Sequence, residues 1–181
     1  MSEADRRRWD ERYAAQGPPP LSSVAPPDIF AGHADLFPTA GTALDVACGQ
    51  GTGSVWLASR GLRVTGLDVS PVAIGHAREL AQRAAVGSRC RFDVVDLDGG
   101  LPAGARVDVI LCCRFRDLRL HRVVAERLAR GGLLAIAVLS EVGASPGAWR
   151  AVAGELPAAF AGLHLIDADE GDGRAWLLAR R

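Results

Sequence analysis

Three glycines at alternate positions are the first residues whose types and spacing indicate chemistry. Gly49, Gly51 and Gly53 stand in the stretch "LDVACGQGTGS", which also carries Asp45. Glycine permits a tight turn and lets the backbone approach a ligand closely, although it costs conformational entropy. A simple turn from a strand into a helix would need one glycine, so three of them favour a ligand-binding loop.

Two further acidic residues follow the next two predicted strands. Asp68 follows the glycines at close to the spacing, about 20 residues, at which an acid binds the ribose hydroxyls of a nucleotide. Its alternative role is a favourable charge at the N-terminus of the next helix, where Ser70 already provides a cap. Asp96 could accept an adenine amino proton, with Val69 and Leu97 against the ring faces; its alternative is a solvated loop carboxylate.

Two cofactors that contain a nucleoside fit such acids. A dinucleotide site would need the pattern G-x-G-x-x-G and a helix N-terminus free for a pyrophosphate. In "GQGTGS" the sixth position is Ser54, and the third glycine comes one residue early. Asp45 would repel a diphosphate but attract the sulfonium and ammonium groups of S-adenosylmethionine. The stretch therefore favours S-adenosylmethionine over NAD.

Length and composition limit the class of protein. The chain has 181 residues, of which 49% are hydrophobic and 23% charged, which is typical of one globular domain. No apolar run reaches the ~18 residues of a membrane span, and the charged N-terminus lacks the apolar core of a signal peptide. The net charge of zero does not favour a nucleic acid partner.

The four cysteines carry no metal or redox spacing. Cys48, Cys90, Cys112 and Cys113 form neither a CxxC pair nor a Cys/His cluster, so no metal site is expected. Reduced cysteines are typical of a cytoplasmic protein, which is the predicted location.

Apolar runs alternate with helical patterns along the chain, which predicts an α/β fold. Strands are expected at 42–47, 62–68, 89–97, 106–113 and 133–139, with a final hairpin in 163–181 around an Asp-Gly turn. Helices are expected at about 3–15, 26–37, 52–60, 70–85, 117–129 and 145–160, the last bent or broken at Pro157. No linker divides the chain, so residues 1–181 are predicted to form one domain, with a helical segment at 1–38 and a core at 39–181.

Four segments together carry a resemblance to a known family. "ALDVACGQGTGSVWLASRGLRVTGLDVSPVAIGHAREL", "DVVDL", "VDVILCC" and "LARGGLLAIAV" resemble successive motifs of the class I S-adenosylmethionine-dependent methyltransferases, over about residues 40–181. Within that superfamily the chain most resembles the small tellurite-resistance-type enzymes. The resemblance implies a Rossmann-like, doubly wound, seven-stranded sheet of order 3-2-1-4-5-7-6. Five parallel strands would be followed by an antiparallel terminal hairpin.

The resemblance also implies which residues bind the cofactor. The end of the first strand and the glycine stretch would line the methionine portion, the acid after the second strand would hold the ribose, and neighbouring residues would hold adenine. A residue after the fourth strand would border both cofactor and substrate. In chain order the set is Asp45, Ala47, Cys48, Gly49, Gly51, Gly53, Asp68, Val69, Asp96, Leu97 and Cys113.

The substrate side is less defined, because "CCRFRD" departs from the Asn, His or aromatic residues that many relatives place after the fourth strand. Arg114 could orient an anionic substrate, since a guanidinium grips oxyanions bidentately. Its alternative is a structural ion pair with Asp117 or Glu126. His121, near the start of the following helix, could also approach the substrate.

The N-terminal helix resembles the lid that precedes the core in related enzymes. Trp9 and Tyr13 are four residues apart and so share one helical face. They could pack the helix onto the core, or Arg12 or Tyr13 could reach the cofactor or the substrate. The other histidines are expected to have surface or packing roles; they are His33, His76 and His164.

These patterns predict an enzyme that transfers a methyl group to a small molecule. Methyl transfer from a sulfonium depends mainly on holding nucleophile and methyl carbon in line, so a binding signature can exist without an identifiable catalytic residue. The catalytic candidates are Arg114, Tyr13 and His121. A non-catalytic domain that binds the cofactor or a partner is the alternative, and an NAD-dependent oxidoreductase is a third interpretation that the glycine spacing opposes.

Overall fold

The computed structural model describes residues 3–181. The chain divides into two compact units, Met1–Gly100 and Leu101–Arg181. Each unit combines parallel strands with helices, as the alternation in the sequence predicts.

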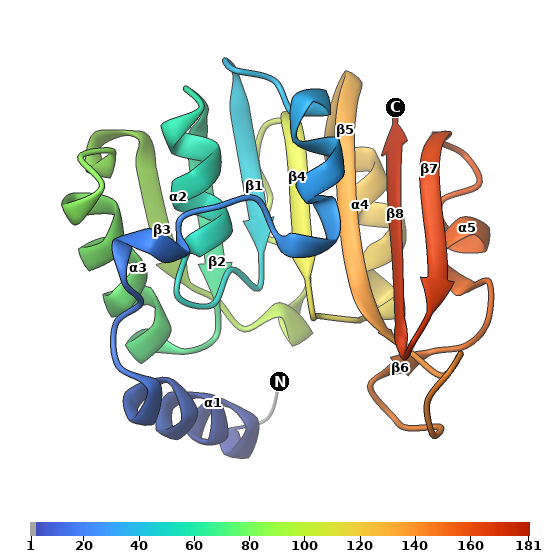
Figure 1. The fold of residues 1–181 in the computed structure, drawn as a ribbon, viewed down its shortest axis with the longest axis horizontal. Coiled ribbons are helices and arrows are strands. Elements are labelled where there is room, and N and C mark those ends of the chain that lie inside the picture. The colour runs from blue at the N-terminus through green and yellow to red at the C-terminus, as the bar shows by residue number, and fades with distance from the viewer. Residues whose placement is uncertain (1–2) are drawn as a thin grey trace. The chain divides into compact units, whose positions relative to one another are not determined.

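The first unit contains three parallel strands in the order β3-β2-β1 (Figure 1). They are β1 (Thr42–Val46), β2 (Arg63–Asp68) and β3 (Cys90–Val94). Because all three run in the same direction, their carboxyl ends lie at one edge, where the glycine stretch and Asp68 emerge. Figure 1 shows α1 (Glu3–Gln16) beyond these carboxyl ends.

Helices α2 (Thr52–Ser59) and α3 (Pro71–Arg83) follow β1 and β2. The start of α3 is fixed by its sequence: Pro71 is its first residue, and the Ser70 side chain accepts a hydrogen bond from Ala73 N. Short 3₁₀ turns complete the unit; they are Leu21–Ser23, Asp28–Leu36, Gly87–Arg89 and Leu97–Gly99.

One buried apolar cluster of the first unit lies between α2, α3 and β3. Its members are Val55, Ile74, Ala77, Leu80, Ala81 and Phe92. An aromatic contact fixes the segment between the 3₁₀ helix and β1, because the rings of Phe37 and Trp56 meet edge-on with centroids 4.9 Å apart. This packing holds the connection to β1 against α2.

The second unit contains the strand order β4-β5-β8-β7. Its strands are β4 (Val107–Cys113), β5 (Leu128–Ser140), β7 (His164–Gly171) and β8 (Arg174–Arg180), with a two-residue strand β6 (Arg150–Ala151) paired to β5. β4 and β5 are parallel, while β8 is antiparallel to β5 and to β7. The β7–β8 turn has Asp172 at φ 50° and Gly173 at φ 75°, the two left-handed residues that a type I′ hairpin requires.

Two short helices accompany these strands, α4 (His121–Arg127) after a 3₁₀ turn at Leu118–Leu120, and α5 (Glu155–Ala159). The second unit's core is the continuous apolar run of β4 and β5. Val109, Ile110 and Leu111 in β4 and Leu133 and Leu134 in β5 are at most 1% exposed. Such runs, buried on both faces, are typical of parallel strands in α/β folds.

The structure confirms the α/β class, the predicted order of strands within each unit and the terminal hairpin. The helix predicted at 26–37 is present as a 3₁₀ helix over Asp28–Leu36. Two boundaries were wrong. β3 ends at Val94 rather than beside Asp96. Helix α4 stops at Arg127 because Leu128 is already extended and pairs with Val107 of β4.

The predicted helix over 145–160 was also wrong. Residues 150–151 form β6, since Ser140 of β5 pairs with Ala151 there and Glu141 N donates to Ala151 O at 3.0 Å. Gly154 adopts φ 75° and starts the much shorter α5. Pro157 does not bend that helix, because it lies in the first turn, where the missing N–H would have had no intrahelical partner.

Gly51 gives the first testable prediction. It has φ 78°, and a Cβ there would come within 2.6 Å of Ala77 Cβ in α3. Gly51→Ala should therefore lower the free energy of unfolding by about 2–5 kcal/mol, which combines left-handed strain with overpacking. Gly49→Ala is the matched control: its φ is 53°, but the added Cβ would meet only the Tyr13 hydroxyl at 2.9 Å, so about 1–2 kcal/mol is expected. Urea unfolding of both variants measures the difference, and equal losses would contradict the packing argument.

Candidate functional site

The Asp68 carboxylate connects the end of β2 to the two segments beside it. Its Oδ2 accepts a hydrogen bond from Gly49 N at 2.8 Å, and its Oδ1 accepts one from Ser70 N at 2.9 Å. The residue is buried, and this burial raises the pKa of its carboxyl. One side chain thus fixes both the glycine loop and the start of α3.

Asp45, at the fourth position of β1, is a second buried carboxylate. Ser54 Oγ donates to its Oδ2 at 2.6 Å. Burial raises its pKa to about 7, and the nearby charge of Asp68 adds to the shift. Within residues 3–181 neither carboxylate takes part in an ion pair. The end of β1 and β2 is therefore a region where an added positive charge would be stabilised.

The glycine loop, defined here as residues 47–51, joins β1 to α2. Its residues Ala47, Gly49 and Gly51 have φ of 56°, 53° and 78°. Cys48 N donates to Leu67 O and Gly51 N donates to Cys48 O, so the loop is held against β2. Because Gly49 N donates to Asp68, three of the loop's N–H groups are engaged within the fold.

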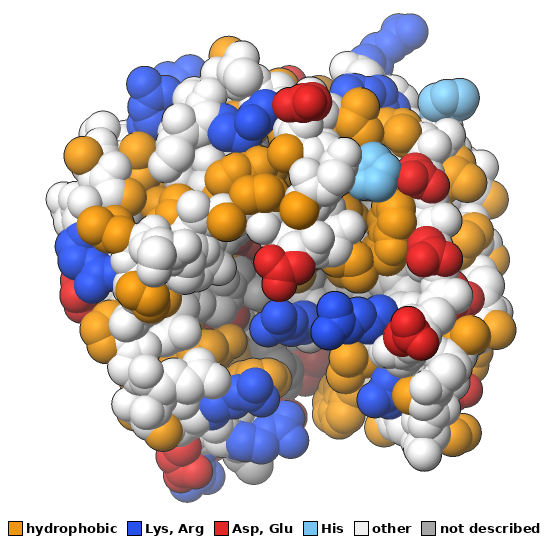
Figure 2. Space-filling view, in the orientation of Figure 1, with side chains coloured by type: hydrophobic (Ala, Val, Ile, Leu, Met, Phe, Trp, Pro, Cys, Tyr) orange, Lys and Arg blue, Asp and Glu red, His pale blue; other side chains and the backbone are white. Residues whose placement is uncertain are grey.

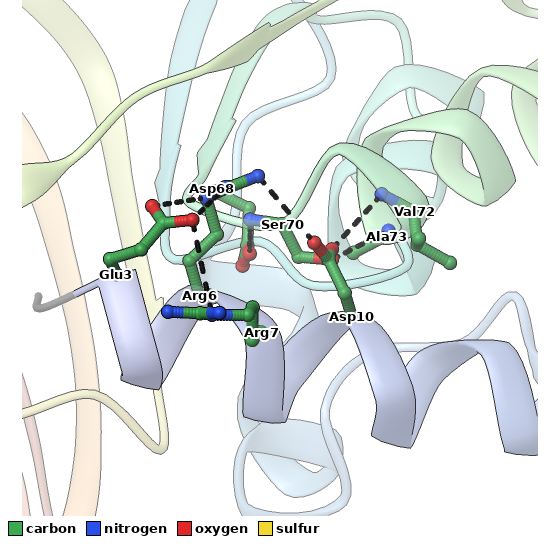
Figure 3. A network of polar contacts seen from close by, with 8 residues as sticks. All are labelled: Glu3, Arg6, Arg7, Asp10, Asp68, Ser70, Val72 and Ala73. Atoms are coloured by element: carbon green, nitrogen blue, oxygen red, sulfur yellow. Dashed lines mark hydrogen bonds and ion pairs between the residues drawn. The ribbon is translucent and has the colours of Figure 1, made fainter.

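Helix α1 lies across this loop and the start of α3 (Figure 3). The Asp10 Oδ1 accepts hydrogen bonds from Ser70 Oγ and, at 3.4 Å, from Val72 N. At the other end of α1, Gln50 Nε2 donates to Gly17 O at 2.7 Å. Between these two attachments the Tyr13 hydroxyl lies directly over Gly49.

Other contacts of α1 fix the orientation of its side chains. The rings of Trp9 and Tyr13 stack with centroids 5.7 Å apart, and the Arg12 guanidinium lies 5.2 Å from the Trp9 ring centroid. Figure 3 shows Glu3 and Arg6 paired on the side of α1 that faces Asp68. The N-terminal helix therefore contacts the predicted binding loop through Tyr13. The Arg12 guanidinium makes a cation–π contact with the Trp9 ring.

The remaining first-unit candidates differ in exposure. Val69 and Leu97 are 3% and 1% exposed and belong to the core. Asp96 is exposed, and its Oδ1 accepts a hydrogen bond from Asp98 N, so it caps the 3₁₀ turn that follows β3. Gly53 is not a loop residue, because it falls in the first turn of α2.

In the second unit, Cys113 ends β4 half-buried and Arg114 follows it fully exposed. Arg114 has φ 62°. The ion pair expected as its alternative does not form: Asp117 pairs with Arg119 at 2.6 Å, and Glu126 pairs with Arg122 at 2.8 Å. Each acid is satisfied by an arginine on its own local segment, which leaves Arg114 out.

His121 is buried at the start of α4. It is 8% exposed and packs against the Phe160 ring with centroids 5.1 Å apart. Its Nε2 has no hydrogen-bond partner, and burial lowers the pKa of the imidazole. These observations describe a neutral histidine packed between α4 and α5.

Sequence reasoning missed three polar residues that organise the first-unit site, Asp10, Gln50 and Ser54. Asp10 lies three residues before Tyr13 and so shares its helical face, which was the available signal. Gln50 lies between two of the glycines, and Ser54 occupies the position that was read only as a departure from the dinucleotide pattern. Their roles depend on contacts across the fold, which spacing does not reveal.

Residues 3–181 contain neither a cluster of metal-binding side chains nor a helix that could cross a membrane. No group of three or more His, Cys, Asp or Glu side chains is arranged to hold a metal ion. No helix in this part of the chain has both the length and the apolar character needed to cross a membrane.

The sequence of residues 43–132 matches the family model described as a methyltransferase domain. No curated protein matches the sequence. These residues include the glycine loop, Asp68, Asp96 and Cys113.

Solved structures of methyltransferases are similar to this chain in fold. TehB from Haemophilus influenzae has a TM-score of 0.73 and 19% identity, over 85% of this chain and 61% of that one. Geranyl diphosphate C-methyltransferase from Streptomyces coelicolor A3(2), solved with Mg²⁺, geranyl diphosphate and S-adenosyl-L-homocysteine, has a TM-score of 0.69 and 15% identity, over 99% and 97% of the two chains. The fold is therefore Rossmann-like, as the resemblance to class I S-adenosylmethionine-dependent methyltransferases predicts, and TehB shares this fold.

The raised pKa of Asp45 predicts how stability depends on pH. Its pKa of about 7 in the folded chain lies above its ordinary value of 3.8, so between those values the folded state binds more protons than the unfolded state. Stability should fall as pH rises through this window, by up to about 1.4 kcal/mol per unit, and level off above it. Asp45→Asn should remove this loss. The difference in free energy of unfolding between Asp45→Asn and wild type should therefore shift by about 2–4 kcal/mol in favour of the variant from about pH 5 to about pH 8.

Urea unfolding at both pH values measures this difference. Asp35→Asn, which changes an exposed acid of the first unit, is the control and should follow the wild-type profile. Parallel profiles for wild type and Asp45→Asn would contradict the assignment.

The attachment of α1 gives a third prediction. Asp10→Ala removes the acceptor for Ser70 Oγ and Val72 N, so amide hydrogen exchange within α1 should accelerate about tenfold, the equivalent of one hydrogen bond. Amides of β1 and β2 should be unaffected. Glu11→Ala, an exposed change on the same helix, is the control. Acceleration that is equal in both variants would show that Asp10 does not hold α1.

Proposed function

We propose that this protein transfers a methyl group from S-adenosylmethionine to a small-molecule acceptor. The observation that carries the proposal is the pair of buried carboxylates, Asp45 and Asp68, beside a glycine loop with alternate left-handed residues. Neither carboxylate has a basic partner in residues 3–181, so the site favours a cation. S-adenosylmethionine supplies two positive groups, a sulfonium and an ammonium, whereas NAD would bring a diphosphate.

Asp68 is suited to hold the ribose while it keeps its structural role. An ionised carboxylate has about four acceptor positions, and two are used by Gly49 N and Ser70 N. The ribose hydroxyls would take the remaining positions. Asp45, the loop residues Ala47, Cys48, Gly49 and Gly51, and the start of α2 at Gly53 would line the methionine portion.

The adenine would lie beside the segment after β3. In this proposal Asp96 accepts from the adenine amino group, and Val69 and Leu97, which are core residues, support the ring through the backbone around them. Cys113 would border both cofactor and acceptor. S-adenosylhomocysteine in the related geranyl diphosphate C-methyltransferase supports this cofactor class.

The reaction is a single displacement. A lone pair of the acceptor forms a bond to the methyl carbon while the C–S bond breaks, and its electron pair stays on sulfur to leave S-adenosylhomocysteine. Holding the two atoms in line can supply roughly 7–11 kcal/mol of the barrier. An acceptor that carries a proton must release it to water or to a base. The residues that could assist are Tyr13, Arg114 and His121, of which Tyr13 lies over the glycine loop.

The surface supports a small acceptor rather than a nucleic acid. The formal net charge is zero, and Figure 2 shows acidic and basic side chains interspersed with apolar ones on the face that it draws. None of the four cysteines forms a disulfide within residues 3–181, in keeping with the proposed cytoplasmic location.

Calorimetric titration with S-adenosylhomocysteine tests the proposal. Asp68→Ala should weaken binding roughly 10- to 100-fold, because a charge-assisted ribose contact is lost, whereas Asp35→Ala should bind as wild type does. Titration with NAD should give no binding. An unchanged dissociation constant for Asp68→Ala would reject the ribose assignment, and release of labelled methyl groups to an acceptor panel separates an enzyme from a non-catalytic domain.

A further inference from the structure

β7 is the last strand of the second unit's sheet, and one of its two edges is open. The strand order ends β5-β8-β7, and of the strands in residues 3–181 only β8 pairs with β7 (Figure 1). An open edge presents N–H and C=O groups onto which a strand of another chain can add. Folded proteins either cover such an edge or block it, so the backbone groups of β7 need to be followed one by one.

The pairing of β8 with β5 shows which residues of β8 face β7. Ser140 N of β5 donates to Gly173 O at 2.8 Å, and Arg181 N donates to Gly132 O of β5 at 3.1 Å. Gly173 and Arg181 flank β8, and both have odd numbers. Since neighbouring residues of a strand direct their backbone groups to opposite edges, the odd-numbered residues of β8 face β5 and the even-numbered ones face β7.

The same alternation divides β7 into inner and outer residues. Asp167 and Asp169 pair with even-numbered residues of β8, so the two aspartates direct their own N–H and C=O groups to β8. Ala168 lies between them and Glu170 follows them. These two residues therefore direct their backbone groups to the open edge.

Both outward N–H groups are already bonded within β7 itself. Asp167 Oδ1 accepts a hydrogen bond from Ala168 N, and Asp169 Oδ1 accepts one from Glu170 N, each at 2.9 Å. The aspartate side chains are exposed. A strand that added to this edge would have to displace two charge-assisted hydrogen bonds and desolvate two carboxylates.

The beginning of the same edge is irregular. The register between β7 and β8 shifts between Leu165 and Asp167, and a bulge of this kind interrupts pairing at the edge of a sheet. The regular part of β7 is thus residues 167–171. Its outward N–H groups are those of Ala168 and Glu170, the two that the aspartates cap.

A second copy of this chain would meet a further obstacle here. Two identical edges related by a two-fold axis are self-complementary, and antiparallel pairing around Ala168 would place Asp167 of one copy opposite Asp169 of the other. If Ala168 lay opposite Glu170 instead, Asp169 would lie opposite its own counterpart. Like charges directly opposite on paired strands are destabilising, so both registers bring aspartate against aspartate.

We propose that Asp167 and Asp169 close the β7 edge to a second copy of this chain. The two carboxylates occupy the outward N–H donors and also place like charges across a paired edge. The protein thereby keeps an eight-residue edge strand without associating through it. This inference concerns the surface of the second unit and is independent of the proposed cofactor and reaction.

The double variant Asp167→Thr/Asp169→Thr of the full chain tests the inference. It frees both N–H groups and removes both charges, and threonine is favoured in strands. Sedimentation velocity over a concentration series should show self-association about tenfold stronger than that of wild type, or more. Hydrogen exchange at Ala168 and Glu170 should slow as the protein concentration rises, because these amides become paired across the edge.

Two control variants separate capping from charge. Asp167→Asn/Asp169→Asn keeps an acceptor oxygen at both positions and removes only the charges, so it should associate less than the threonine pair. Asp172→Asn removes an acid from the turn of the same hairpin, at φ 50°, a left-handed conformation that asparagine tolerates. This variant frees no N–H group of the edge and should behave as wild type does.

The inference would be overturned if the threonine pair sedimented as wild type at every concentration and its exchange at Ala168 and Glu170 did not depend on concentration. Protection of these two amides that rises with concentration in the wild-type chain would also overturn it. Equal association of the asparagine and threonine pairs would reject the capping role. If circular dichroism shows that the threonine pair loses the hairpin, Asp169→Thr alone is measured; it frees one N–H group and should give a smaller change in the same direction.

Discussion

Both oxygens of the Asp68 carboxylate accept backbone N–H groups, and the arrangement of the first unit's site depends on these two bonds. Gly49 N and Ser70 N come from segments that leave different strands, so one buried side chain sets the distance between the glycine loop and the start of α3. Because the bonds partly offset the cost of burying the charge, Asp68 can remain at a strand end without a basic partner. That same lack of a partner is what makes the site attractive to a cation.

The remaining polar contacts of this unit extend from that point. Ser70 caps α3 and also donates to Asp10, so the helix that covers the site is fixed to the residue that Asp68 positions. Gln50 attaches the end of α1 to the glycine loop, and Tyr13 lies between the two attachments. The loop, Asp68 and the covering helix are therefore connected by hydrogen bonds into one network.

In the second unit, β4 and β6 both pair with β5. β4 ends before β5 does, and the exposed edge that remains is covered by β6. A largely buried Arg116–Glu155 pair fixes the segment after β4 to the segment after β6.

The sequence by itself determined the α/β class, the Ser-Pro start of α3 and the Asp-Gly hairpin, because these follow from local periodicity, caps and turn residues. The strand order within each unit followed only from the resemblance to a known family. The sequence also identified the glycine loop and the acids at the ends of the strands. Only the tertiary structure decided that residues 150–151 form a strand rather than a helix, since the unoccupied edge of β5 outweighs local helix propensity. It likewise decided that a side chain at position 51 would meet Ala77, that Asp10 and Gln50 hold α1, and that Arg114 has no ionic partner within residues 3–181. Each of these depends on residues that are far apart in the chain, and pairing across such distances leaves no periodic trace in a single sequence.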